Sequence, residues 1–239
     1  VHSYGRWEPE FAPRARARPG GGFLVVPHEN LALALDAGLE EQWRVEWTER
    51  YVDPWRYLVA PNGDLYIEAA VTNEDDRDGV PVGGGGTFDV ADGRRIQAVL
   101  RYRADDGSFV EGEPLIGGRD RGAQVDFAGV DADGGYVIYG LSYCSIPFGG
   151  RDHCVSGRSA NFFFAAFYSA DHAFERVTKL DIVHGDKERM EVADAVVRED
   201  GAVTMAIVTE DDSTIGIEGT RIQLHDELLL LVEIAPSGE

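Results

Sequence analysis

One pattern recurs along the chain: an apolar run, a polar turn that ends in glycine, and a second run in which apolar residues alternate. It is clearest in RYLVAPNGDLYIEAAVT, residues 56–72, where the turn glycine is Gly63. The pattern returns around Gly134 and Gly201, and in a poorer copy around Gly21. Glycine suits the positive φ of a tight hairpin turn, and Asn or Asp before it favours the same turn. The pattern therefore predicts four antiparallel hairpins.

A second hairpin follows each of the four glycine turns. Ranges 97–112 and 162–180 share the order of an apolar strand, a short Ala-Asp turn and another strand, and 31–47 and 221–234 follow it more loosely. The Leu, Ala, Glu and Gln residues of 31–47 also favour a helix, but the alternation of its leucines favours a strand. We expect units of about four strands within a single domain spanning 1–239, at residues 14–50, 56–116, 125–182 and 192–235.

Repeating four-stranded units of this size are typical of propeller blades. A sheet with Ala, Gly, Val and Ile on both faces cannot bury both of them alone, whereas packing against neighbouring sheets covers them. We therefore expect an all-β, β-propeller-like array of about four four-stranded blades. Four copies fit either a small closed ring or part of a larger one. A large β-sandwich is the alternative.

The same residues resemble a known family. PNGDLYI at 61–67, followed by AVLRYRADDGS at 98–108, is similar to the repeats of bacterial β-propeller proteins of the secreted and surface type. The resemblance implies a propeller fold and a place outside the cytoplasm. RYRADDGSF also resembles the Asp-box turn of sialidase-like propellers, but Phe109 stands where that motif ends in Trp. No glycosidase residues are therefore carried over.

The charge balance and the hydropathy pattern limit the partners. Forty-three acidic residues stand against 22 Lys and Arg, giving a formal net charge of −21. Such an acidic surface repels phosphate backbones, so we expect no nucleic-acid partner. No window approaches the length of apolar sequence that a membrane span needs, so we expect no membrane-spanning segment. The chain begins at Val1 without a basic and apolar leader, which favours a mature or trimmed form.

The two cysteines, Cys144 and Cys154, bracket a loop rich in turn residues. A disulfide between them would close a loop of about ten residues and stabilise the fold by roughly 2.5 to 3 kcal/mol. It would also indicate an oxidising location, which is extracellular, periplasmic or at the cell surface. Two reduced thiols are the alternative, because the pair with the intervening His153 matches no common zinc spacing.

The longest insertions fall between the hairpins of the second and third units, at 73–93 and 144–161. Binding residues tend to lie on such loops, so we expect the recognition surface there. Glycines 83–86, without a neighbouring Lys, indicate a flexible linker. Gly85 stands where an EF-hand needs its bidentate Glu, so a solvated acidic loop is the alternative to a Ca²⁺ site. The acidic residues whose spacing partly resembles a calcium loop are Glu74, Asp75, Asp76 and Asp78.

Aromatic and basic residues supply the remaining binding candidates. Trp43, Trp47 and Trp55 crowd the first quarter of the chain, where they serve either as core or as a stacking platform for sugar rings. Arg151 and Arg158 flank Cys154 and can meet an anionic ligand in an otherwise acidic field.

No catalytic motif is evident. GLSYC at 140–144 ends in Cys where a nucleophile elbow needs its second Gly, and the six histidines show no zinc spacing. We expect a secreted or cell-surface binding or scaffold module, recognising a protein or a carbohydrate, rather than an enzyme. One alternative is a glycan or ester hydrolase on the same scaffold. The other is a structural assembly subunit whose exposed sheet edges pair with another chain to form an oligomer.

Overall fold

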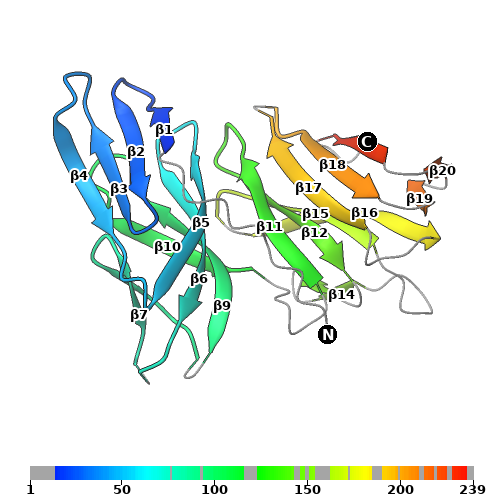
Figure 1. Ribbon diagram of the computed structural model, residues 1–239, viewed down its shortest axis with the longest axis horizontal. Coiled ribbons are helices and arrows are strands. Elements are labelled where there is room, and N and C mark those ends of the chain that lie inside the picture. The colour runs from blue at the N-terminus through cyan, green and yellow to red at the C-terminus, as the bar shows by residue number, and fades with distance from the viewer. Residues whose placement is uncertain are drawn as a thin grey trace. The chain divides into compact units, whose positions relative to one another are not determined.

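The described part of the chain is built from antiparallel β-sheets joined by turns, with no helix (Figure 1). The chain forms two compact units, Val1–Gly112 and Glu113–Glu239. The computed structural model describes residues 14–75, 77–91, 94–115, 123–142, 146–148, 151–153, 162–171, 173–184, 190–198, 200–209, 213–217, 220–224 and 228–235.

Unit 1 contains two four-stranded sheets with the same up-and-down strand order. Sheet 1 consists of β1 (Arg14–Ala17), β2 (Phe23–His28), β3 (Leu31–Leu35) and β4 (Glu41–Glu46). Sheet 2 consists of β5 (Val52–Val59), β6 (Leu65–Thr72), β9 (Arg95–Tyr102) and β10 (Phe109–Pro114). Between the second and third strands of sheet 2 the chain inserts a small hairpin, β7 (Val80–Gly83) and β8 (Gly86–Phe88).

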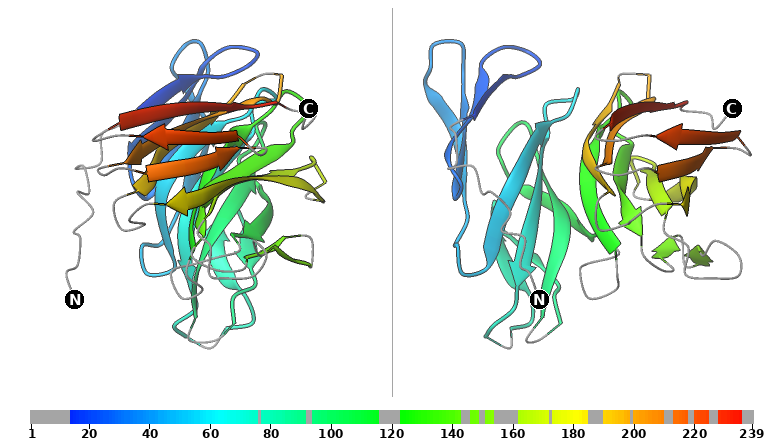
Figure 2. Two further views of the ribbon diagram at one scale, coloured as in Figure 1. Left: turned by 90° about the vertical axis from the view of Figure 1, so that its right-hand side faces the viewer. Right: turned by 45° about the vertical axis from the view of Figure 1, so that its right-hand side comes forward.

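Unit 2 contains two further sheets, which Figure 2 shows from two other directions. Sheet 3 begins with β11 (Ala123–Val130), β12 (Tyr136–Ser142), β15 (Phe162–Tyr168) and β16 (Phe174–His184), with the hairpin β13 (Ile146–Phe148) and β14 (Arg151–His153) inserted after β12. Sheet 4 consists of β17 (Met190–Val197), β18 (Val203–Thr209) and β21 (Leu228–Ile234). The hairpin inserted into sheet 4, β19 (Ser213–Ile217) and β20 (Thr220–Leu224), joins the edge of sheet 3 beside β16.

The turn between the first and second strands has the same hydrogen bonds in all four sheets. In sheet 2, the Ala60 N–H donates to the Asp64 carbonyl at 2.9 Å, and the Gly63 N–H donates to the Ala60 carbonyl at 2.8 Å. The same two bonds recur within 18–22, 131–135 and 198–202. In each turn the glycine has a positive φ: 102° at Gly21, 90° at Gly63, 88° at Gly134 and 78° at Gly201. The predicted equivalence of the four glycines is therefore confirmed.

Each unit has one apolar core, formed by residues from both of its sheets. In unit 1 the core includes Ala32 and Ala34 of β3 and Ile67 and Ala69 of β6, all fully buried. The central strands β6, β12 and β15 are buried almost without interruption on both faces. A strand buried on both faces reads as a continuous apolar run, and FFFAAFY in β15 is such a run.

The inserted hairpin of sheet 2 is packed into the fold, and the interpretation of its glycines as a flexible linker is wrong. Val80 and Val82 are fully buried, and the Tyr102 hydroxyl donates to the Val82 carbonyl at 2.5 Å. The Phe109 N–H donates to the Gly84 carbonyl at 3.0 Å. A Cβ at Gly83 would lie 2.8 Å from the Glu46 carbonyl, so the hairpin also touches β4.

Two of the three described inserts thus contact the fourth strand of the preceding sheet: β7–β8 contacts β4, and β19–β20 pairs with β16. The predicted all-β array of about four propeller-like sheets is confirmed, with two corrections. Among the described residues sheet 3 has six strands, because it accepts an insert, and sheet 4 has three. Closure into a ring and the single-domain organisation stay predictions.

Candidate functional site

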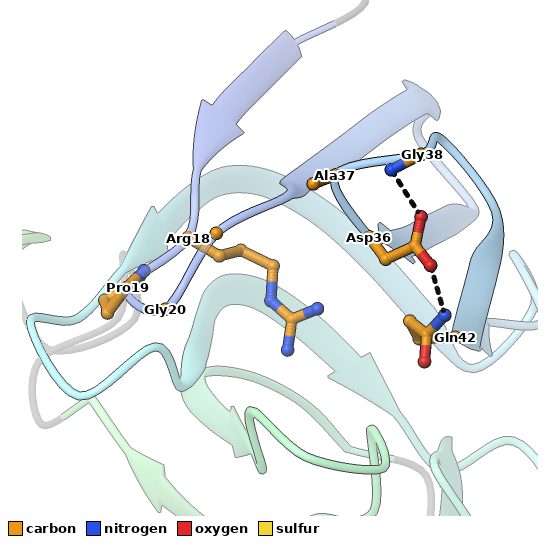
Figure 3. A pocket seen from close by; sticks show the side chains of 8 residues that line it. Arg18, Pro19, Gly20, Asp36, Ala37, Gly38 and Gln42 are labelled. Atoms are coloured by element: carbon orange, nitrogen blue, oxygen red, sulfur yellow. Dashed lines mark hydrogen bonds between the residues drawn. The ribbon is translucent and has the colours of Figure 1, made fainter.

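A shallow hollow of about 430 Å³ lies at the turn end of sheet 1 (Figure 3). The β1–β2 turn and the β3–β4 turn form its walls. The lining residues are Arg18, Pro19, Gly20, Gly21, Asp36, Ala37, Gly38 and Gln42.

The polar groups of this hollow hold the two turns in place. The Asp36 Oδ1 accepts from the N–H groups of Gly38 at 2.8 Å and Glu40 at 3.0 Å. The Arg18 guanidinium donates to the Ala104 carbonyl and lies 5.6 Å from the centre of the Trp43 ring. These contacts serve the turns themselves, and they assemble no cluster of groups suited to catalysis.

The acidic loop predicted to bind Ca²⁺ is engaged in ion pairs. Asp75 pairs with Arg50, pairs with Arg77 at 3.2 Å, and accepts the Tyr51 hydroxyl at 2.6 Å. Glu74 lies 3.4 Å from Arg50. The hydrogen bond from Tyr51 is the main cause that lowers the pKa of Asp75, and the two arginines act in the same direction.

These contacts define what a cation would meet at this loop. Asp78 is exposed, and Asp76 lies outside the described residues. The described part of the chain has no group of three or more His, Cys, Asp or Glu residues placed to hold a metal ion. Calcium binding by the loop stays a prediction, and a cation there would compete with Arg50 and Arg77 for the Asp75 carboxylate.

The three candidate tryptophans occupy different environments. Trp43 and Trp47 belong to the core of unit 1, with 7% and 5% of their surface exposed. Their indole N–H groups donate to the Ala104 carbonyl at 2.8 Å and to the Tyr102 hydroxyl at 2.9 Å. Trp55 is half-buried; its Nε1 is the buried part of the ring and has no hydrogen-bond partner. A role in ligand binding therefore stays a prediction with Trp55 as its best-placed residue.

The other predicted site residues lie in or beside the insert of sheet 3. Arg151 begins β14, and its side chain is not among those described. Arg158, Cys144 and Cys154 lie outside the described residues. The anion site and the disulfide stay predictions.

Sheet 4 carries an exposed apolar surface that the sequence analysis did not single out. Leu229 and Leu231 of β21 are 60% and 63% exposed, and Val196 of β17 is 51% exposed. The strand register places Val208 opposite Leu229 and Ala206 opposite Leu231, on the same face of the sheet. We call this surface the leucine face; its members are Val196, Ala206, Val208, Leu229 and Leu231.

The opposite face of sheet 4 belongs to the core of unit 2. Val232 and Ile234 of β21 are buried there together with Met205 and Ile207 of β18. Because side chains alternate along a strand, the run LLLLVEI must turn half of its members outward. Four consecutive leucines were therefore the signal in the sequence that pointed to this surface.

Charged residues border the leucine face. Arg198 lies 2.8 Å from Asp200 and 3.1 Å from Glu233. Glu191 and Asp194 of β17 are exposed as well. The border therefore has more acidic than basic residues among those described.

The repeated turns and sheets define the class, an all-β protein of propeller-like antiparallel sheets.

No helix in the described part of the chain is long and apolar enough to cross a membrane.

Comparison with known proteins identifies similar structures but no family. No family model matches the chain, and no curated protein matches it. The chain is similar to the Dos1 propeller at 9% identity and a TM-score of 0.36, over 91% of this chain and 57% of that one. It is similar to BamB from Moraxella catarrhalis at 13% identity and a TM-score of 0.28, over 92% of this chain and 80% of that one. Likenesses at this level carry no information about activity or partner.

Proposed function

We propose that this protein is a secreted or cell-surface scaffold module that binds a protein partner through the leucine face of sheet 4. The observation that carries the proposal is the exposure of Leu229 and Leu231 side by side with Val208 and Ala206. Burying a leucine side chain fully is worth about 1.5 to 3 kcal/mol. A contiguous apolar surface left in water on a regular sheet is typical of a protein interaction site.

The inserts support the scaffold part of this role. The β7–β8 hairpin fills space beside β4, and β19–β20 extends sheet 3 beside β16. Each insert therefore ties one sheet to the next within its unit, which is the kind of bracing that a scaffold needs. The inserts 73–93 and 144–161 stay predicted recognition surfaces, and most of 144–161 lies outside the described residues.

Carbohydrate binding is the second candidate. The half-buried Trp55 favours it, because the exposed part of an indole offers a flat apolar surface on which a sugar ring can stack. This candidate uses a different sheet from the leucine face, so the two can be separated by mutation.

The experiment compares four forms of the immobilised protein, the unmodified chain and three variants, against a peptide display library and a glycan array. We expect the unmodified chain to enrich peptides, the double variant Leu229→Ser, Leu231→Ser to lose that enrichment, and Phe23→Ser to keep it. Phe23 is the matched control because it is an exposed large apolar residue, at 40%, on sheet 1. Absence of peptide enrichment by the unmodified chain would refute protein binding. Glycan binding that persists in the double variant and is lost in Trp55→Ala would assign the function to carbohydrate instead.

A further inference from the structure

Within the residues that the structure describes, sheet 4 has one strand fewer than the pattern that the other sheets follow. Sheets 1 and 2 each have four strands, and sheet 3 has four strands of its own before the added hairpin. Among the described residues, β21 pairs with β18 and with no other strand. β21 is the third strand of its sheet, so the position that no described strand fills is that of the fourth.

An edge strand offers unpaired backbone donors and acceptors along one side. In sheets 1 and 3 the corresponding fourth strand runs antiparallel to the third, as β4 does to β3 and β16 does to β15. A strand added to β21 in this way would continue both faces of sheet 4. Its inward side chains would lie beside Val232 and Ile234, and its outward side chains beside Leu229, Leu231 and Glu233.

The residues on and beside β21 determine which side chains an added strand would need. Inward positions require apolar side chains, because Val232 and Ile234 are buried in the core of unit 2. Outward positions meet two exposed leucines and then Glu233. Asp200 and Glu233 share the single Arg198, and the whole chain carries a formal net charge of −21. Basic outward residues are therefore favoured at the Glu233 end, and a second copy of this acidic chain is disfavoured.

We propose that β21 accepts an extended segment of a partner protein as the fourth strand of sheet 4. The segment runs antiparallel to β21, has apolar residues at alternate positions, and carries Lys or Arg beside Glu233. This inference rests on the proposed function, since it specifies the partner and the manner of binding at the same surface. Main-chain hydrogen bonds would supply affinity and the alternate side chains specificity.

The probe is a synthetic peptide of seven residues, the length of β21, in which Val alternates with Lys or Arg. Two control peptides have the same length: one replaces the basic residues with Glu, and the other has the same composition with its valines grouped together. Amide hydrogen exchange of the full chain, resolved for β21, is measured with each peptide. We expect one set of alternate β21 amides to exchange rapidly in the chain alone and to slow at least tenfold with the alternating basic peptide only.

Two matched variants separate the edge from the rest of the face. Leu231→Lys places a positive charge on β21, and Val196→Lys places one on β17, at the other side of the same sheet. We expect Leu231→Lys to weaken peptide binding at least tenfold, and Val196→Lys to weaken it less than threefold. Melting temperatures within a few degrees of the unmodified chain would show that both variants are folded.

Each remaining outcome would identify a different occupant of the β21 edge or show that no strand is added there. Slow exchange of both sets of β21 amides in the chain alone would mean that a segment of this chain already occupies the edge, and would overturn the inference. Concentration-dependent dimerisation with the same protection would assign it to a second copy. Equal binding of the alternating and grouped peptides, lost in Leu231→Lys without protection of β21, would keep the leucine face as a binding surface and refute strand addition.

Discussion

At the scale of single residues, each of these tight turns has one position with a left-handed backbone, and in the β3–β4 turn that position holds a leucine. Leu39 occupies in the β3–β4 turn the place that glycine holds in the first turn of each sheet. The Leu39 N–H donates to the Asp36 carbonyl at 3.0 Å, and Leu39 has a φ of 65°. A left-handed conformation costs an L-residue about 1 to 2 kcal/mol relative to glycine.

Leu39→Gly should therefore raise the free energy of unfolding by about 1 kcal/mol. Leu39→Ala is the control, because it removes the same exposed side chain without relieving the backbone, and it should change the stability by less than about 0.5 kcal/mol. Urea denaturation followed by tryptophan fluorescence measures both. An equal gain from the two variants would attribute the effect to the exposed side chain instead of the backbone.

A second residue-scale prediction concerns Asp64, the acid that follows the Gly63 turn. Asp64 is 8% exposed and accepts from Arg101 Nη2 at 2.7 Å and from the Ala104 N–H at 2.9 Å. Asp64→Ala should cost about 2 to 4 kcal/mol, because it leaves the partly buried Arg101 guanidinium with Glu111 alone and a part-buried amide without its acceptor.

The control for Asp64 is Asp53→Ala, which removes the exposed pair with Arg95. That pair spans 2.8 Å, with both side chains more than half exposed, so its loss should cost about 0 to 1 kcal/mol. Both variants are compared by their urea midpoints. Similar midpoints would mean that the Asp64 contacts add no more than a surface ion pair.

The pH dependence of Asp75 gives a third prediction. The pKa of Asp75 lies below its ordinary value of 3.8, chiefly because the Tyr51 hydroxyl donates to the carboxylate. A lowered folded-state pKa means that Asp75 stabilises the fold at pH values above 3.8, and that this contribution is lost as the pH falls through the folded pKa. Tyr51→Phe should raise the Asp75 pKa measured by NMR titration. A pKa that does not change in Tyr51→Phe would leave Arg50 and Arg77 as the cause.

At the scale of elements, the sequence predicted hairpins well where a turn glycine and an alternating strand occurred together. It predicted a strand for 31–47 from the alternation of leucines, and β3 and β4 lie there. The residues that β3 buries completely are Ala32 and Ala34, whereas its leucines are half-buried. Alternation shows that a strand has two faces, but only the neighbouring sheet decides which face is inside.

The insert β7–β8 shows where local signals are insufficient. Its strands have four and three residues and a turn of glycines, a composition that favours a linker when viewed alone. The strands form because Val80 and Val82 become buried in the core of unit 1, which is a tertiary effect. The close approach of β4 and of the chain entering β10 then explains Gly83, Gly84 and Gly86.

Two neighbouring glycines of this insert test that explanation. Both have a positive φ, but a Cβ at Gly84 would lie 2.5 Å from the Gly107 carbonyl, whereas a Cβ at Gly85 would meet nothing within 4 Å. Gly85→Ala should therefore cost about 1 to 2 kcal/mol, from the backbone alone. Gly84→Ala should cost at least about 1 to 3 kcal/mol more, because packed backbone has to move. Equal losses in thermal unfolding would mean that the hairpin is not held against the β9–β10 turn.

At the scale of the whole molecule, the candidate site was visible in the sequence only in part. Four leucines in a strand must place some side chains outward, so the leucine face could have been inferred from Leu228 to Leu231. The edge of β21, which no described strand covers, could not, and neither could the sheet that the hairpin β19–β20 joins. That choice follows from pairing with β16, a long-range contact that no local pattern encodes.

The net charge gives the last prediction, which concerns the whole surface. With a formal net charge of −21, repulsion between carboxylates opposes the compact state. The ion pairs between Arg198 and Asp200 and between Arg44 and Glu46 are exposed on both sides, and such pairs add about 0 to 1 kcal/mol each. Salt should therefore screen more repulsion than attraction.

We expect the melting temperature to rise by roughly 2 to 4 °C between low salt and about 0.2 M NaCl, the shift that about 1 kcal/mol produces in a protein of this size. Sodium chloride and sodium thiocyanate should act alike over this range, because screening depends on ionic strength. A melting temperature that falls with salt would mean that the ion pairs outweigh the net charge. The same screening should weaken binding of the basic peptide to β21, so stability and peptide affinity should change in opposite directions as salt is added.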